Sequence, residues 1–269
     1  MASIAAAARA RLDLSQVART WELLMLLTAR EVKLRYQGTV LGFLWTLAKP
    51  LFLAMVLYFA LNRVLGITVA DAPYHLFLLS ALFPWGWFQG SIQLSAPSFA
   101  NNAALLKKVY FPRFVLPLST VTNQLIHFVL SIPILMLLLL ISGRHPGPEW
   151  LLGIPLLIAI QLLLLAGAVL VVASFDVFLR DLEHLAEVFL NLWFYLTPIL
   201  YPLSRVPESV KPLLLINPMT SLIEAWRDLF LKNQLPSADI WPALVFTAVT
   251  LVAGALVFKT LEGHFEDAL

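Results

Sequence analysis

Long uncharged runs are the feature of this 269-residue chain that most restricts how it can fold. Five of them contain no Asp, Glu, Lys or Arg, and a sixth is interrupted only by Lys49. Each is long enough, or nearly so, to cross a bilayer as a helix that rises 1.5 Å per residue. We therefore expect six transmembrane helices, at about residues 40–63, 75–96, 114–142, 150–174, 185–203 and 240–259.

The composition favours an all-α integral membrane protein. Charged residues make up 13% of the chain, about half of their usual share in soluble domains, and the mean hydropathy is +0.85. The runs are continuously apolar, whereas the strands of a membrane β-barrel alternate in polarity. A net charge of +2 is too small to indicate a nucleic-acid partner, and the absence of Cys excludes disulfides and thiolate metal sites.

The distribution of Lys and Arg predicts the orientation. If the N-terminus lies inside, the inner segments hold eleven of these residues and the outer segments six. Cytoplasmic segments usually carry this excess, so we expect both termini to be cytoplasmic. The predicted organisation is a cytoplasmic N-terminal region (1–37), a membrane domain (38–260) and a cytoplasmic C-terminus (261–269).

Two segments do not fit simple spans. Residues 15–37 mix Trp21 and several leucines with cations, which is typical of an amphipathic helix that lies on the inner membrane surface against anionic lipids. Residues 205–239 contain apolar stretches that are broken at Asn217-Pro218, and neither half reaches the roughly 17 residues needed to cross. We expect two short helices that enter the outer leaflet and return.

Five segments in order resemble the membrane subunit of ABC-2 type exporters of polysaccharides such as O-antigen, capsule and teichoic acid. The first is the amphipathic helix, and the similarity extends from about residue 15 to 260. The other four segments are RYQGTVLGFLWTLAKPL (35–51), FANNAALLKKVYFPRFVLPL (99–118), FLRDLEHL (178–185) and FYLTPILYPLSRVPESVKPLLLINPMTSLIEAWRDLFL (194–231).

The resemblance implies a transport subunit of the bacterial inner membrane with no chemistry of its own. In that family the subunit forms a homodimer, binds two copies of a separate ATPase, and encloses a conduit for a lipid-linked polysaccharide. ATP and Mg²⁺ would then bind the ATPase, and this chain would hold no cofactor. The chain contains no GxxxxGK[ST] phosphate loop, which agrees with this division of labour.

The resemblance also implies a coupling helix, which transmits the movement of the ATPase, between the second and third spans. Alanine and leucine favour a helix there, and an asparagine can cap its start. The alternative is an ordinary inner loop whose lysines only follow the topology rule. The candidate coupling residues are Asn101, Asn102, Ala103, Ala104, Leu105, Leu106, Lys107 and Lys108.

Candidate conduit residues lie in the first and fifth spans. Lys49 would cost about 2.5–3.5 kcal/mol near the bilayer centre, so it either faces the conduit, where it could meet the pyrophosphate of a carrier lipid, or extends to the inner headgroups. Phe43, Trp45, Trp193 and Tyr195 could stack on sugars or belong to interfacial aromatic belts. Trp193 and Tyr195 point to different faces of one helix, so at most one of them lines the conduit.

The family resemblance implies an outer gate in the segment between the fifth and sixth spans. Its candidate residues are Asn217, Pro218, Glu224, Arg227 and Asp228. Glu224 and Asp228 are four residues apart and share a helix face, with Arg227 adjacent. The alternative is a solvated polar face at the outer surface.

Other polar residues have structural explanations. The acidic residues and the histidine of 176–187 could suggest a metal site, but Arg180 would compete for the carboxylates, so we expect ion pairs and no metal. Within the spans we expect hydrogen bonds between helices from Asn123, Gln124, His127 and Gln161.

Three other functions agree less well with the sequence. A related permease for a drug, an ion or haem is the nearest alternative. An intramembrane enzyme acting on lipid-linked sugars would need converging acid, base or metal groups at one depth, and only Lys49 lies deep. A proton-coupled transporter usually carries carboxylates within its spans, which these runs lack.

Overall fold

The structure is a computed structural model that describes residues 2–38, 44–69, 72–109 and 111–268. These residues form helices joined by turns and loops, with no strand among them, which confirms the all-α class. By length and composition, four helical stretches of the described chain could cross a membrane. They are Leu47–Val64, Val115–Ile141, Trp150–Asp176 and Ala238–His264.

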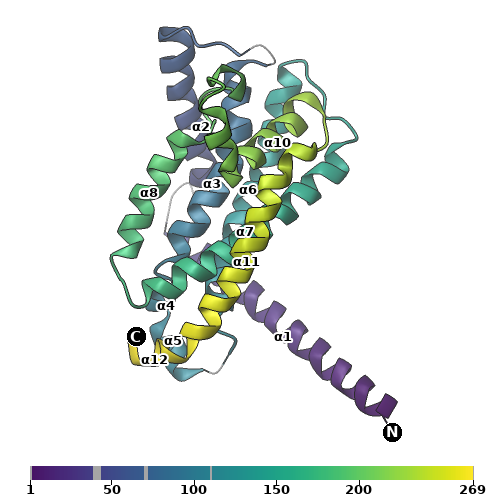
Figure 1. The fold of residues 1–269 in the computed structure, drawn as a ribbon, viewed down its shortest axis with the longest axis vertical. Coiled ribbons are helices and arrows are strands. Elements are labelled where there is room, and N and C mark those ends of the chain that lie inside the picture. The colour runs from purple at the N-terminus through teal and green to yellow at the C-terminus, as the bar shows by residue number, and fades with distance from the viewer. Residues whose placement is uncertain (1, 39–43, 70–71, 110, 269) are drawn as a thin grey trace.

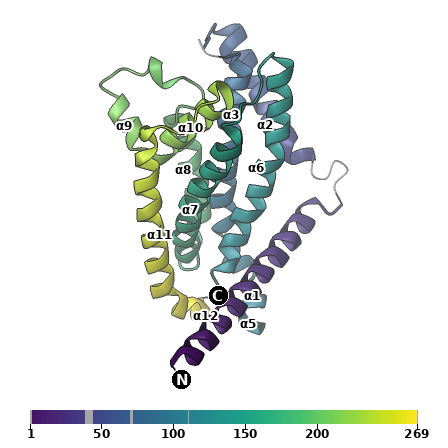
Figure 2. The ribbon, with the colours of Figure 1, turned by 90° about the vertical axis from the view of Figure 1, so that its right-hand side faces the viewer.

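The long helices form a bundle that is crossed at one end by α1 (Ala2–Tyr36) (Figures 1 and 2). That end, which we call the basal end, also carries the short helices α4 (Ser98–Asn101), α5 (Ala103–Lys108) and α12 (Phe265–Ala268). Both chain termini therefore lie toward the same end of the bundle (Figure 2). The remaining long helices are α2 (Leu44–Leu57), α3 (Tyr74–Ser95), α6 (Val115–Ile141), α7 (Trp150–Asp176), α8 (Leu182–Leu196) and α11 (Trp241–Leu261).

The main hydrophobic core surrounds α3 and α10 (Pro218–Lys232), which are the most deeply buried helices. Large aromatic side chains fill it. Phe128 of α6 stacks on Trp87 of α3 at 5.3 Å and meets Trp226 of α10 edge-on at 5.0 Å. Such ring pairs add to the favourable packing of their large apolar surfaces.

A second, smaller core closes the basal end and is called the basal cluster here. It unites residues from helices far apart in the sequence, and its rings are in direct contact, with Phe99 of α4 lying 4.8 Å from Phe265 of α12. Leu105 and Leu106 of α5 pack against it. Its buried members are Leu27, Phe99, Val115, Leu116, Ala173, Val177, Phe258 and Phe265.

The fifth predicted span, 185–203, is too long. Helix α8 ends at Leu196, and Thr197 is extended with φ −97° and ψ 139°. Pro198 explains this end, because a proline pushes the preceding residue out of the helical region and lacks an amide donor of its own. The 15 residues of α8 reach only about 22 Å.

Other predicted elements match the structure in outline. The amphipathic helix expected over 15–37 is the second half of α1. The first predicted span is α2 followed by a π-helical turn, η1 (Tyr58–Val64), while its residues 40–43 lie outside the described part of the chain. Two short helices, α9 (Lys211–Ile216) and α10, meet at Asn217 as expected. Single 3₁₀ turns lie at Leu203–Arg205, Ala238–Ile240 and Glu262–His264.

Helices α7 and α11 cross at a contact between two glycines. A Cβ atom on Gly167 would overlap the backbone carbonyl of Thr250, and one on Gly254 would overlap the carbonyl oxygen of Gly167. Small residues permit such close approach of membrane helices, where van der Waals packing supplies much of the association energy.

Candidate coupling, conduit and outer-end sites

The predicted coupling segment lies at the basal end and has two distinct faces. Asn101, Ala104, Lys107 and Lys108 are exposed, whereas the leucines of α5 pack on the basal cluster. The three- and four-residue spacing of the exposed positions is that of one helical surface. The structure therefore presents two lysines outward on a helix that is anchored by its apolar side.

Asn102 separates α4 from α5 and holds them in place. It occupies the N-cap position of α5, but its side chain does not cap that helix. Instead its Nδ2 donates to the Ser98 carbonyl at 2.9 Å, and its Oδ1 accepts from Arg30 Nη1 of α1 at 3.1 Å. The predicted capping role is wrong, because these two partners engage the side chain.

The conduit candidates on α2 are exposed in the single chain. Trp45 is 53% exposed and Lys49, one turn further along, is exposed too. Residues four apart lie on the same helix face, so the cation and the indole lie near each other along one side of α2. Phe43 lies outside the described residues.

The two aromatic candidates on α8 diverge, as their spacing predicts. Trp193 packs inward, where its ring lies 5.3 Å from Phe88 and 5.1 Å from Phe189. Tyr195 is 64% exposed. Of the 15 residues in α8, Leu190 alone is buried, so this helix presents most of its apolar side chains outward.

Asn217 connects the C-terminal end of α8 to the start of α10. Its Oδ1 accepts from the Met219 amide at 2.9 Å, which is an N-cap bond, and its Nδ2 donates to Thr197 Oγ1 at 2.9 Å. Pro218 at the first helical position fits this cap, because a proline there sacrifices no intrahelical hydrogen bond.

The charged residues of α10 form two separate pairs. Arg227 is 3% exposed; its Nη1 lies 2.6 Å from Glu224 Oε1, and its Nη2 donates to the Ile199 carbonyl at 2.8 Å. Asp228 pairs instead with Lys232 at 2.8 Å, at the half-exposed edge of the helix. A fully solvated face is therefore wrong for this segment.

Burial changes the pKa values of both partners of the Arg227–Glu224 pair. It raises the pKa of the Glu224 carboxyl, and the neighbouring Arg227 guanidinium opposes that rise. Burial likewise lowers the pKa of Arg227, against the attraction of Glu224. Each charge compensates the desolvation of the other, which is the condition under which buried ions are tolerated.

Gln161 confirms the expectation that polar residues within the spans connect helices. Its Nε2 donates to the Pro84 carbonyl of α3 at 2.8 Å, and its Oε1 accepts from Trp226 Nε1 of α10 at 2.9 Å. Gln161 is fully buried on α7. One amide therefore links three helices at the centre of the main core.

Asn233 is a structural residue that sequence reasoning missed. It lies just beyond α10 in the left-handed region, with φ 53° and ψ 44°. Its Oδ1 accepts from the Gly147 amide and from Trp150 Nε1, and its Nδ2 donates to the His145 carbonyl. An asparagine after a helix is the available signal, because Asn is one of the few non-glycine residues that adopt this conformation readily.

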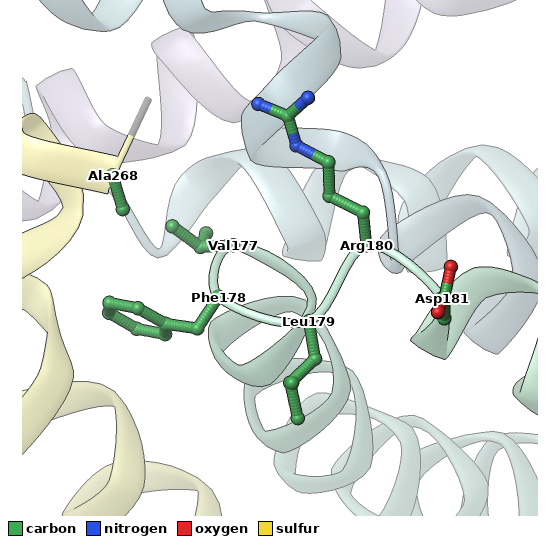
Figure 3. Close-up of a pocket in the computed structure, with 6 residues that line it drawn as sticks. All are labelled: Val177, Phe178, Leu179, Arg180, Asp181 and Ala268. Carbon is green, nitrogen blue, oxygen red and sulfur yellow. The ribbon is translucent and has the colours of Figure 1, made fainter.

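The turn between α7 and α8 lines a cavity of about 500 Å³ at the basal end (Figure 3). Phe178 extends toward α12, where its ring lies 6.2 Å from Phe265. Arg180 and Asp181 point in different directions (Figure 3). The polar residues of 176–187 differ in burial: Asp176 is buried, while Arg180, Asp181, Glu183, His184 and Glu187 are exposed.

Comparison with known proteins decides the family. Residues 22–231 match the family model described as ABC-2 type transporter. The chain belongs to the ABC-2 type transporter family. The matched region contains the candidate coupling segment, the candidate conduit helices α2 and α8, and the Arg227–Glu224 pair of α10, and it ends before Lys232 and α11.

The ABC-2 relatives include two groups of polysaccharide transport proteins. The chain is 37% identical to an O-antigen export system permease protein of Klebsiella pneumoniae, over 93% of this chain and 95% of the relative. It is 36% identical to a protein of the same name from Myxococcus xanthus, over 92% and 95%. A polysialic acid transport protein of Escherichia coli is 25% identical over 87% and 91%.

Proposed function

We propose that this chain is the membrane subunit of an ATP-driven exporter that moves a lipid-linked polysaccharide across the bacterial inner membrane. The observation that carries the proposal is the near full-length similarity to O-antigen export permeases, 37% identical over 95% of the relative. The polysialic acid transport relatives support the same substrate class from a greater distance.

The proposed topology has six spans with both termini in the cytoplasm. Helix α3 is free of Asp, Glu, Lys and Arg, and its 22 residues extend about 33 Å, which is sufficient to cross. Helix α8 supplies the fifth span together with the turn residues that follow it. Placing both ends of the chain inside agrees with their position at one end of the bundle (Figure 2).

The proposed conduit lies between two copies of the chain. Helices α2 and α8, with the turn η1 that follows α2, support this, because their exposed apolar residues include Trp45, Phe52, Phe59, Phe189 and Tyr195. A second copy would cover part of this surface, and lipid the rest. Lys49, on the same side of α2 as Trp45, would then meet the phosphates of the carrier lipid, while the aromatic rings contact the glycan.

Energy for transport would come from a separate ATPase, with two copies per homodimer. The exposed Lys107 and Lys108 favour α5 as its contact, because they project from a helix whose leucines are anchored in the basal cluster. We also propose that the pairs of α10, with Asn217 and Pro218, form the outer closure of the conduit. ATP and Mg²⁺ would bind the ATPase.

The test is reconstitution with a candidate ATPase of the ABC type. We expect the two proteins to co-purify, the chain alone to hydrolyse no ATP, and the complex in proteoliposomes to move a lipid-linked glycan in an ATP-dependent way. Stimulation of ATP turnover by a drug or haem, without glycan export, would favour a different ABC-2 substrate. Intrinsic ATP turnover by the single chain would contradict the proposal.

A further inference from the structure

Two consecutive residues of α1 contact the elements on either side of the coupling helix. Arg30 Nη1 donates to Asn102 Oδ1, at the start of α5, and Ser119 Oγ of α6 donates to Glu31 Oε1 at 2.7 Å. Neighbouring residues on a helix point about 100° apart, so these side chains reach different partners from one turn of α1.

The contact of Glu31 is sheltered. Ser119 is fully buried, and Asn123, one turn further along α6, is 1% exposed with its Nδ2 3.5 Å from Glu31 Oε2. A hydroxyl hydrogen bond to a carboxylate is stronger than one between neutral groups, and a low dielectric strengthens it further. Leu27 and Thr28, one turn earlier in α1, are buried as well, so this part of α1 is docked.

The direct chain connection between α5 and α6 is not helical, although its Phe111 and Phe114 pack against the basal cluster. Residues 109 and 111–114 are not helical, and Val109 is extended with φ −132° and ψ 130°. An irregular segment bends under a push, whereas a helix held at two points moves as a unit. The route from Asn102 through α1 to Ser119 bypasses this linker.

We propose that Arg30 and Glu31 are positioning residues that transmit the movement of α5 to α6. This proposal rests on the proposed function, in which an ATPase displaces α5. When α5 moves, Asn102 carries Arg30 with it, and the adjacent Glu31 shifts the start of α6 through Ser119. Neither residue touches substrate or nucleotide in this scheme.

The test measures the glycan exported per ATP hydrolysed by the full complex in proteoliposomes. We expect Glu31→Leu and Ser119→Ala each to lower this ratio at least about fivefold, the lower end of typical coupling effects, while ATP turnover stays within about twofold. The double variant should be no worse than either single one, because both remove the same contact. Glu31→Gln should retain most of the ratio, since its amide oxygen still accepts from Ser119.

Glu22→Leu is the matched control, because Glu22 is an exposed carboxylate on the same helix. It should leave the ratio unchanged. A purely structural role of Glu31 would lower export and ATP turnover together, and an unchanged ratio in both Glu31→Leu and Ser119→Ala would overturn the proposal. If the wild-type complex binds no ATPase, the proposed function fails and this inference fails with it.

A cysteine cross-link tests the other contact without relying on Glu31. The chain has no Cys, so Arg30→Cys combined with Asn102→Cys introduces the only thiols. If α1 and α5 move together, the unlinked double variant, which lacks the Arg30–Asn102 contact, should export less glycan per ATP than the wild type, and linking the two helices with a short bifunctional thiol reagent should restore the ratio. Loss of export on linking would show that the contact must open during the cycle, which would contradict the proposal.

Discussion

The guanidinium carbon of Arg227 lies 3.6 Å from the centre of the Phe77 ring, so a buried cation of α10 rests on α3. The ion pair with Glu224 and the hydrogen bond to the Ile199 carbonyl occupy other sides of the same group. Cation–π attraction strengthens when the cation is desolvated, as it is here. Helix α10 is therefore part of the core, with Arg227 directed inward.

Replacement of Arg227 by Leu should strongly destabilise the protein. The change leaves the half-buried carboxylate of Glu224 without its cation; breaking a fully buried pair costs about 3–5 kcal/mol, so we expect a loss near the lower end of that range. The measurement is the free energy of unfolding of purified protein in a denaturing-detergent titration. Lys211→Ala is the control, because it breaks an i,i+3 pair with Glu208 that is largely solvated and is worth less than about 1 kcal/mol. Equal effects of the two changes would contradict the buried pair.

The replacement Gln161→Leu should loosen the junction of three helices. It removes the acceptor of Trp226 Nε1 and the donor to the Pro84 carbonyl, and the loss should be about 1–3 kcal/mol because both groups are left buried without that partner. Gln234→Leu, at an exposed position outside the helices, should have little effect in the same unfolding titration. A stable Gln161→Leu variant would show that the amide contributes only packing.

The glycine crossing predicts a sharp difference between two alanine substitutions. Gly167→Ala would place a methyl group against the backbone of Thr250. Because a backbone cannot shift as a flexible side chain can, the change should lower the free energy of unfolding by about 1–3 kcal/mol. Gly86→Ala adds the same methyl group where nothing lies within 4 Å, so it should be neutral or slightly stabilising. Thermal unfolding of the two variants in detergent makes the comparison. Equal stabilities would mean that α7 and α11 are further apart than the structure shows.

Uncharged runs locate helices well, because the bilayer penalises charge more strongly than any local propensity. They locate α8 less well. The uncharged run continues through residue 203, but Pro198 ends the helix at Leu196, and a hydropathy pattern does not reveal how a proline restricts the backbone. Periodicity also fails to predict that Arg227 is buried, since a charge on a short helix usually faces solvent. The ring of Phe77 and the carbonyl of Ile199, both remote in sequence, contact the buried guanidinium in addition to Glu224 of the same helix.

Contacts between remote segments account for the other omissions. Glu31 is one of several charges on a basic amphipathic helix, and its sequence does not distinguish it from the exposed Glu22. Its partner Ser119 is 88 residues away. The short helix α5 was easier to predict, since its alanines, leucines and lysines lie in one short stretch, although the side chain of Asn102 binds partners other than its own helix.

Charge reversal at Lys107 and Lys108 should uncouple export. Both side chains are exposed at the basal end, so replacing them with Glu should leave insertion and folding intact while weakening the contact with the ATPase. We expect export to fall at least about fivefold in proteoliposomes. Lys259→Glu, an exposed cation in the last turn of α11, is the control and should retain export. If the double reversal exports at the wild-type rate, α5 is an ordinary inner loop.

The last prediction concerns Lys49, where two explanations differ in outcome. If Lys49 meets the phosphates of the carrier lipid, Lys49→Leu removes a charge-assisted contact of about 1.5–3 kcal/mol and should weaken substrate engagement about 10- to 150-fold. Lys49→Arg keeps the charge and should retain most of the activity. If the side chain instead extends to the inner headgroups, both variants should export normally, because a leucine inserts favourably into the bilayer. The measurement is the concentration of lipid-linked glycan that gives half-maximal stimulation of ATP turnover: an increase in Lys49→Leu alone supports the conduit position, and identical values in both variants exclude it.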